Sequence, residues 1–384
     1  MAGRRPCGRR RLLLAGAAVA AATGCSPVAV TGAASLSPVT AAPAAKPADR
    51  PMPAAAPSSA STASSRRPTG RPVTIAFAGD VHFAGSVGAR LAADPATAVG
   101  PMSQVLRHSD LAIANLETAI TTRGTPAAKQ YVFRAPPTAI AALEAAGIDL
   151  VTEANNHGMD YGVEGLRDSI EDARAVDFPV IGIGLDEDAA FAPYRATISG
   201  QRIAVIGATQ VLDDNLAAAW TAGPNKPGLA SAKDVPRLLA AVRAARTSSD
   251  TLIVYLHWGT ELHSCPTDRQ RDLAGQLIAA GADVVVGSHA HVLLGAGYLN
   301  GAYVDYGLGN FLFYVSGGAP TAESGVLTLT VRGRAVVGGR WDPARILDGA
   351  PRPLTGAAAT RAIRSWQALR GCAGLAASPG PGPG

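Results

Sequence analysis

The sequence predicts a mixed α/β fold with two β-sheets and helices packed on the outside of them. Strand-like and helix-like runs alternate from about residue 71 to about residue 375, which is the pattern of an α/β domain. The run at 283–286 is apolar after its first residue, as is typical of a parallel strand covered on both faces. After residue 291 the runs pair around short turns, so the later sheet is expected to be largely antiparallel.

The individual elements follow from local patterns. Strands are predicted at 73–78, 112–114, 148–152, 180–183 and 252–256, with hairpins over 196–206, 298–306 and 326–339. Helices are predicted at 137–146, 163–176, 233–245 and 267–280. Gly147 is the expected stop of the first of these helices. About 300 residues of this composition suit one large domain, with boundaries at 71–375.

The first 25 residues are predicted to be a secretory signal peptide. A head with five arginines precedes an apolar run at 12–22 that is too short to span a bilayer. The stretch 9–13 loosely fits a twin-arginine export signal. Residues 22–25 resemble a bacterial lipoprotein box, which would place a lipid on Cys25 and attach the protein to a membrane. The alternative is simple cleavage, so the predicted product is exported, either as a cell-surface lipoprotein or as a secreted protein.

Two further segments are predicted to lie outside the fold. Residues 26–70 consist mainly of Ala, Pro, Ser and Thr, which cannot bury enough apolar surface to offset chain entropy, so they are expected to form a disordered linker. The Pro/Gly tail at 376–384 is expected to be disordered as well. The formal net charge is +5, and the five head arginines account for it. The rest of the chain is therefore close to neutral, which argues against nucleic acid as a partner.

The cysteines indicate one disulfide bond. Cys7 and Cys25 belong to the predicted signal peptide, which leaves Cys265 and Cys372 in an exported domain. Two cysteines in an oxidising compartment usually pair. We therefore predict a bond between them that ties the C-terminal segment to the loop after Trp258.

Side chains that can bind metal follow five of the predicted strands. They are Asp80 and His82, then Glu117, Asn156 and His257, and finally His289 and His291. Ligands of α/β sheets bind beyond the carboxyl ends of the strands. Seven nitrogen and oxygen donors without a thiolate are too many for one zinc ion and enough for two divalent ions that share a carboxylate. The donor set does not select among manganese, iron, zinc and nickel.

The order of these motifs resembles a known family. Gly-Asp-x-His at 79–82, Asn-Leu-Glu at 115–117, Asn-Asn-His at 155–157, His-Trp-Gly at 257–259, Gly-x-His-x-His at 287–291 and Leu-Gly-Asn-Phe at 308–311 are similar to motifs of the CapA family. These are bacterial capsule or poly-γ-glutamate synthesis proteins of the calcineurin-like metallophosphatase superfamily. The resemblance covers about residues 73–315 and implies a metallophosphatase-like αββα sandwich of two mixed sheets flanked by helices.

The resemblance also implies roles for single residues. The first metal would be held by Asp80, His82, Glu117 and His291, and the second by Glu117, Asn156, His257 and His289. Glu117 would bridge the two ions, although the superfamily usually bridges with the shorter Asp. His157 matches the catalytic histidine and would protonate the leaving oxygen or stabilise the phosphoryl charge; the alternative is a structural role beside the ligands. Weaker candidates for substrate contact are Asn155, Arg134 and Trp258. Asn155 could instead cap a turn, Arg134 is more simply a surface charge, and Trp258 is more simply a core residue.

Three functions fit these observations. The first is an exported two-metal phosphoesterase that uses metal-bound hydroxide, with His157 as the acid. The second is a non-catalytic, metal-containing accessory in the synthesis, export or anchoring of an envelope polymer. The third is a metal-dependent amide hydrolase that acts on polyglutamate. The expected partner is an anionic envelope polymer or a phosphoester substrate.

Overall fold

The computed structural model describes residues 70–314 and 320–380. The chain divides into the units Met1–Ala63 and Ser64–Gly384, and the description below concerns the second unit. The predicted signal peptide with Cys25, the linker up to residue 69 and the last four residues of the predicted tail lie outside the described residues. Within the described residues, no helix is long and apolar enough to cross a membrane.

One of the two main sheets has eight strands. Its order is β18-β17-β16-β1-β2-β5-β6, and β15 also pairs with β1. The strands β1, β2, β5 and β6 are parallel, whereas β16, β17 and β18 continue the sheet as antiparallel neighbours. The bounds are β1 (Val73–Val81), β2 (Leu111–Leu116), β5 (Leu150–Thr152), β6 (Val180–Ile181), β15 (Asn310–Leu312), β16 (Glu323–Arg332), β17 (Ala335–Leu347) and β18 (Ala350–Pro353).

The other main sheet has six strands in the order β13-β14-β12-β11-β9-β8. Its four inner strands are parallel, and β13 and β8 pair antiparallel at the two edges. The bounds are β8 (Tyr194–Ile198), β9 (Gln201–Thr209), β11 (Thr251–His257), β12 (Val284–Ser288), β13 (Ala296–Leu299) and β14 (Ala302–Asp305).

The expectation of a separate, largely antiparallel later sheet is wrong. The predicted hairpin over 298–306 is present as β13 and β14, but β14 extends the six-stranded sheet beside β12 as a parallel strand. The hairpin over 326–339 is present as β16 and β17, and β16 pairs with β1 in the eight-stranded sheet. Both hairpins thus complete sheets begun earlier in the chain, so both sheets are mixed, as the predicted fold class requires.

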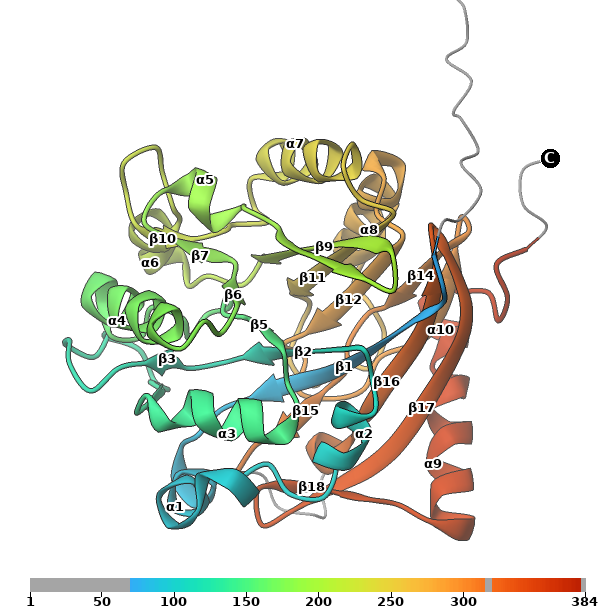
Figure 1. Ribbon diagram of the computed structural model, residues 1–384, viewed down its shortest axis with the longest axis horizontal. Helices are drawn as coiled ribbons and strands as arrows, with labels where there is room; N and C mark the ends of the chain where they lie inside the picture. Colours follow the sequence, from blue (N-terminus) through green and yellow to red (C-terminus); the bar gives the residue numbers. More distant parts are fainter. Residues whose placement is uncertain (1–69, 315–319, 381–384) are drawn as a thin grey trace, which may run out of the picture. The chain divides into compact units, whose positions relative to one another are not determined.

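The two sheets face one another, and helices cover their outer faces (Figure 1). Alternate side chains of β1 show the two environments: Ile75 and Phe77 join a core with residues of the other sheet, whereas Ala76 and Ala78 pack in the core beneath the first helices. This alternation is the two-residue period of a strand. The covering helices are α1 (Gly85–Ala93), α2 (Ser103–Arg107) and α3 (Thr138–Ala146) on one side, and α7 (Val235–Arg246) and α8 (Asp268–Ala280) on the other.

The remaining elements lie around this sandwich. Helix α9 packs along β17, where the rings of Trp341 and Trp366 stack with centroids 5.0 Å apart. Two small sheets pair β3 with β4 and β7 with β10. The bounds are α4 (Gly162–Ala175), α5 (Glu187–Ala190), α6 (Asp214–Trp220), α9 (Gly356–Ala368), α10 (Arg370–Ala373), β3 (Ala119–Ile120), β4 (Arg134–Ala135), β7 (Ile183–Gly184) and β10 (Gly228–Leu229).

Local sequence signals set one end each of helices α3 and α8. Helix α3 ends at Gly147, which has φ 81°, the left-handed conformation that glycine adopts without strain. Helix α8 begins with a capping box, in which the Thr267 hydroxyl accepts from the Gln270 amide and the Gln270 side chain accepts from the Thr267 amide. Both helices begin and end within one residue of the predicted bounds.

A disulfide bond joins Cys265 to Cys372, whose Cα atoms are 5.6 Å apart. The bond connects the loop before α8 to the short helix α10. Arg271 on α8 reinforces this connection, because its guanidinium donates to the carbonyl oxygens of Cys372 and Ala373, each at 2.7 Å. The C-terminal segment is therefore held against the six-stranded sheet by a covalent bond and by charge-assisted hydrogen bonds.

The end of β14 buries a carboxyl group that makes stability depend on pH. Asp305 is fully buried; Oδ1 accepts from the Gly307 amide at 2.9 Å, and Oδ2 has no hydrogen-bond partner among the described residues. Burial raises the pKa of Asp305 from 3.8 to about 8. Between these two pH values the folded protein holds a proton that the unfolded chain has released. The Asp305 contribution to the free energy of unfolding is therefore complete below about pH 4 and is lost as pH rises through about 8.

We expect Asp305→Asn to remove this contribution, because asparagine keeps the acceptor for Gly307 and carries no titrating group. Wild type should lose up to about 5 kcal/mol more unfolding free energy than the variant between pH 4 and pH 9. Urea unfolding of both proteins across this range measures the difference. Parallel pH profiles for the two proteins would contradict the assignment.

Candidate metal centre

The candidate centre lies where the carboxyl ends of the parallel strands of both sheets meet. Asp80 is near the end of β1, Glu117 follows β2, His257 ends β11 and His289 follows β12. The His289 amide donates to Asp80 Oδ2 at 3.2 Å, which connects the two sheets at this point. Side chains from strands that are up to 209 positions apart in the chain are therefore brought into one cluster.

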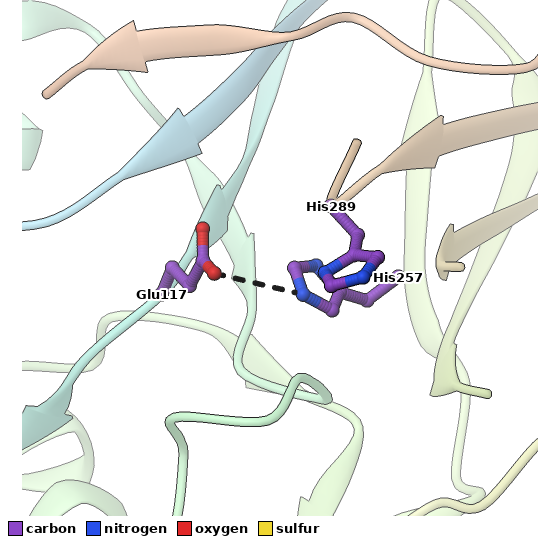
Figure 2. Close-up of side chains that lie close together, drawn as sticks. All are labelled: Glu117, His257 and His289. Atoms are coloured by element: carbon purple, nitrogen blue, oxygen red, sulfur yellow. Dashed lines mark ion pairs between the residues drawn. The ribbon is translucent and has the colours of Figure 1, made fainter. Parts of the chain in front are cut away.

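Two overlapping groups of donors share one carboxylate. Ligand atoms of Glu117, His257 and His289 lie within 4.8 Å of one another, and so do those of Asp80, Glu117 and His291. Figure 2 shows the first group, with the carboxylate of Glu117 facing the ring of His257 at 3.7 Å between Oε1 and Nε2. Glu117 Oε1 is also 4.0 Å from His291 Nε2. Glu117 thus stands in the position that a bridging ligand requires.

Asn156 adds an oxygen donor to the first group. Its Oδ1 is 2.8 Å from His257 Nε2, the same ring nitrogen that faces Glu117. A cation at this point would be reached by an amide oxygen, a carboxylate and two imidazoles, which is a donor set typical of first-row divalent metals.

Neighbouring polar groups orient the ligand side chains. His257 Nδ1 lies 3.0 Å from Ser288 Oγ, so its Nε2 faces Asn156. His291 Nδ1 lies 2.9 Å from Asn310 Oδ1, so its Nε2 is the nitrogen on the side of Glu117. Hydrogen bonds of this kind fix the tautomer and ring orientation of metal-binding histidines. Asn310 lies in one of the sequence motifs, but its contact with His291 was not predicted.

The buried polar atoms fit divalent cations. Both carboxylate oxygens of Glu117 are buried without a hydrogen-bond partner within residues 70–314 and 320–380, and so is His289 Nδ1. Burial and the neighbouring Asp80 raise the pKa of Glu117 well above its usual value. An unpaired buried carboxylate is costly, and positive charge placed between these groups would offset that cost.

The imidazole pKa values agree with this fit. Burial, together with the positive charge of neighbouring imidazoles, lowers the pKa of His257 well below its usual value, and burial lowers that of His289 to about 3. Both rings are therefore neutral, as metal ligands must be. Burial opposes protonation of His291, but Glu117 and Asp80 outweigh it and raise its pKa to about 10. A cation at this position would replace the proton that His291 holds between two carboxylates.

His82 does not join these donors. None of the metal-ligand groups found within residues 70–314 and 320–380 includes it. Its ring stacks on Phe133 with centroids 4.8 Å apart and meets the edge of Phe313 at 4.0 Å, and its Nδ1 accepts from the Ala84 amide at 2.9 Å. His82 as a ligand stays a prediction; in this structure aromatic contacts and a backbone hydrogen bond hold its ring.

His157 lies beside the donor cluster and is held by a buried carboxylate. Its Nδ1 is 2.6 Å from Asp160 Oδ2, and its Nε2 is 3.9 Å from Glu117 Oε1. Asp160 is fully buried, accepts from the Phe133 amide at 2.6 Å and lies 3.0 Å from Lys129 Nζ. Burial lowers the pKa of His157, and its hydrogen bond to Asp160 opposes this effect. The ring is therefore oriented with Nε2 toward the centre.

The contacts of Asp160 and Lys129 were not predicted from the sequence. Asp160 follows His157 by three positions, a spacing that can place both side chains together in a turn, and this spacing was the available signal. Lys129 comes from a loop without a motif. Its ammonium group also donates to the Asn156 carbonyl oxygen, so it contacts both the loop that carries His157 and the carboxylate that orients it.

A cleft of about 430 Å³ opens the centre to solvent. Asn156, His157 and His291 line it together with Lys129. Its outer part includes the exposed side chains of Tyr131, Leu262 and Tyr314. A substrate could thus reach the donors and His157 from one side.

The weaker substrate-contact candidates do not line this cleft. Asn155 is fully buried and donates to Asn115 Oδ1 and to the Leu116 carbonyl, while its Oδ1 accepts from the His157 amide. Trp258 is fully buried and donates to the Tyr306 carbonyl at 3.0 Å. Arg134 lies over the ring of Tyr161 on the surface. Hydrogen bonds thus occupy Asn155, whereas Trp258 packs in the core and Arg134 is a surface charge, which are the alternatives to substrate contact for these two residues.

Comparison with known proteins agrees with this site. Residues 74–315 match the family described as bacterial capsule synthesis protein PGA_cap. The chain is 31% identical over 255 residues to the PGA biosynthesis protein CapA of Bacillus subtilis, covering 65% of each chain. It is 30% identical over 266 residues to the capsule biosynthesis protein CapA of Bacillus anthracis, covering 67% of this chain and 63% of that protein. It therefore spans about two thirds of the length of these relatives.

Among solved structures, one described as a novel phosphatase from Mycoplasma pneumoniae is similar with a TM-score of 0.45 and 15% identity, over 77% of this chain and 97% of that one. The family match covers all of the motifs from Asp80 to Asn310, including each side chain of the two donor groups. This chain belongs to the family of bacterial capsule synthesis proteins.

Proposed function

We propose that this protein is an exported, two-metal phosphoesterase that acts in the metabolism of an envelope polymer of the capsule or poly-γ-glutamate type. The observation that carries the proposal is the position of Glu117, whose buried carboxylate belongs to both donor groups and has no hydrogen-bond partner among the described residues. Asn156 and His291 beside it line an open cleft. The names of the Bacillus relatives support the biological setting. The predicted signal peptide supports export, with a lipid on Cys25 as the means of attachment.

The ligands in this proposal are the residues that the structure brings together. Asn156, Glu117, His257 and His289 would hold one cation, and Asp80, Glu117 and His291 the other. Two divalent cations bound there supply Lewis-acid polarisation of a phosphoryl group and a nucleophile derived from water at neutral pH. The donor set leaves manganese, iron, zinc and nickel as candidates.

His157 is proposed as the general acid. Asp160 accepts a hydrogen bond from His157 Nδ1, so the Nε2 side of the ring faces the cleft. From there Nε2 can donate a proton to the leaving oxygen of a phosphoester. Asp160 also stabilises the charge on the protonated ring. Lys129 places a positive charge 3.0 Å from the other oxygen of the same carboxylate.

The experiment that tests the proposal compares the metal content of the chain without its predicted signal peptide with that of a His289→Ala, His291→Ala double variant. Purification should avoid chelating resin. We expect close to two equivalents of metal in wild type, hydrolysis of phosphomonoesters or phosphodiesters, and loss of both in the variant. A His108→Ala, His263→Ala variant is the matched control, because these histidines belong to none of the donor groups within the described residues.

Two results would overturn the proposal. Absence of bound metal after incubation with manganese or zinc would exclude the two-metal centre. Metal binding with hydrolysis of γ-linked glutamate chains and no turnover of phosphoesters would replace the phosphoesterase with an amide hydrolase.

A further inference from the structure

The loop after β11 carries a carboxylate that belongs to neither of the two donor groups described above. Glu261 is exposed and lines the cleft. One of its carboxylate oxygens and one ring nitrogen each of His289 and His291 lie within 4.8 Å of one another, which forms a third group of potential ligands. This group shares one histidine with each of the groups that contain Glu117, so it lies against the same centre.

Backbone hydrogen bonds hold this loop against the two histidines. The Trp258 amide donates to the Ser288 carbonyl at 3.2 Å, and the Leu262 amide donates to the Ala290 carbonyl at 2.8 Å. The two donors precede and follow Glu261 in the chain, and the two acceptors precede and follow His289. The position of the Glu261 backbone relative to the histidines is therefore set by the fold, although the side chain itself is exposed.

Three residues other than glycine have positive φ here. Leu262 has φ 62° although its side chain is 63% exposed, and His289 and His291 have φ 93° and 56°. Positive φ in residues other than glycine is unfavourable and is concentrated at functional sites. The strained residues are the two histidines of this third group and the residue next to Glu261.

A second observation also points to a bound cation. His289 is 5% exposed, and its Nδ1 is buried without a hydrogen-bond partner in the part of the chain that the structure describes. Charge gives the same indication, because the proposed ligands include only two carboxylates, Asp80 and Glu117, for two divalent cations. A third carboxylate on the solvent side would reduce the excess positive charge that remains.

We propose that Glu261 is an additional metal ligand, which caps the centre from the solvent side beside His289 and His291 and competes with anionic substrates for the same cations. This inference rests on the proposed two-metal centre. A phosphoryl group that enters the cleft would displace the carboxylate, which the exposed side chain permits without movement of the buried ligands. Glu261 thus makes cation binding tighter and anion binding weaker in the resting protein.

The test is a titration of the metal-free protein with Mn²⁺ by calorimetry, for wild type, Glu261→Gln and Glu261→Asp. We expect two equivalents in each protein, with the affinity for at least one of them about tenfold weaker in Glu261→Gln. Glu261→Asp keeps the charge with a shorter reach and should recover part of the affinity. At saturating Mn²⁺, inorganic phosphate should bind Glu261→Gln several-fold more tightly than wild type.

Asp213→Asn is the matched control. Asp213 lines the same cleft, and its substitution removes the same charge. It belongs to none of the ligand groups within the described residues. Its Mn²⁺ affinity should stay within about twofold of wild type. Equal losses in Glu261→Gln and Asp213→Asn, or no loss in either, would overturn the inference and leave the two-metal centre intact. Absence of Mn²⁺ binding to wild type would overturn both proposals.

Discussion

Glu117→Gln is expected to weaken the binding of both cations by at least about 100-fold, or about 2.8 kcal/mol for each site. Glu117 is the one residue shared by the two groups that contain the strand-end ligands, and both of its carboxylate oxygens lack a hydrogen-bond partner among the described residues. Glutamine keeps the shape but removes the charge and one oxygen donor. Calorimetric titration with Mn²⁺ and metal analysis of the purified protein measure the loss.

The fold should survive this change, because glutamine removes a buried charge whose isolation is costly. Thermal unfolding separates the two effects. Added Mn²⁺ should raise the melting temperature of wild type but not that of the variant, since a cation stabilises only a protein that binds it. Two tightly bound equivalents in Glu117→Gln would refute the bridging role.

Glu153→Gln provides the comparison. Glu153 is also fully buried, and burial raises its pKa well above the usual value, but its Oε1 accepts from the Ser169 hydroxyl at 2.8 Å and it belongs to no ligand group within residues 70–314 and 320–380. We expect Mn²⁺ binding by Glu153→Gln to equal that of wild type. A similar loss in both variants would indicate a general effect of buried charge instead of ligation.

His157→Gln is expected to lower kcat for phosphoester hydrolysis by about 10² to 10⁴-fold, with the metal content unchanged. His157 faces the cleft with Nε2 and contacts the ligand cluster without belonging to a ligand group among the described residues. The measurement is steady-state kinetics on a phosphomonoester and a phosphodiester, together with metal analysis. Loss of metal along with activity would indicate that His157 supports the ligands and does not act as an acid.

Asp160→Asn tests the orientation of the same ring. Asp160 makes a 2.6 Å contact with His157 Nδ1 and lies beside Lys129. Replacing its carboxylate by an amide should therefore lower kcat and shift the pH dependence of kcat without removing metal. His108→Gln, on an exposed histidine outside the cleft, should leave kcat unchanged. Full activity in Asp160→Asn would show that the ring needs no carboxylate to hold it.

Much of the site could be predicted because its parts are local in sequence. A strand whose apolar run ends in Asp80, Glu117, His257 or His289 already places that side chain at the carboxyl edge of a sheet, where ligands bind. The two cysteines outside the signal peptide left one pairing within the domain, and the structure contains that bond. Helix ends at Gly147 and Thr267 followed from residues within one turn of them.

Contacts between distant segments were decided only in the tertiary structure. The two late hairpins were predicted as hairpins, but their pairing with β12 and with β1 is visible only in the tertiary structure. His82 has the sequence position of a ligand, yet its ring lies between Phe133 and Phe313, which come from loops far away in the chain. Periodicity determines which way a side chain faces. The partner that covers it depends on packing between distant segments, and the sequence of one segment does not indicate which other segment it will contact.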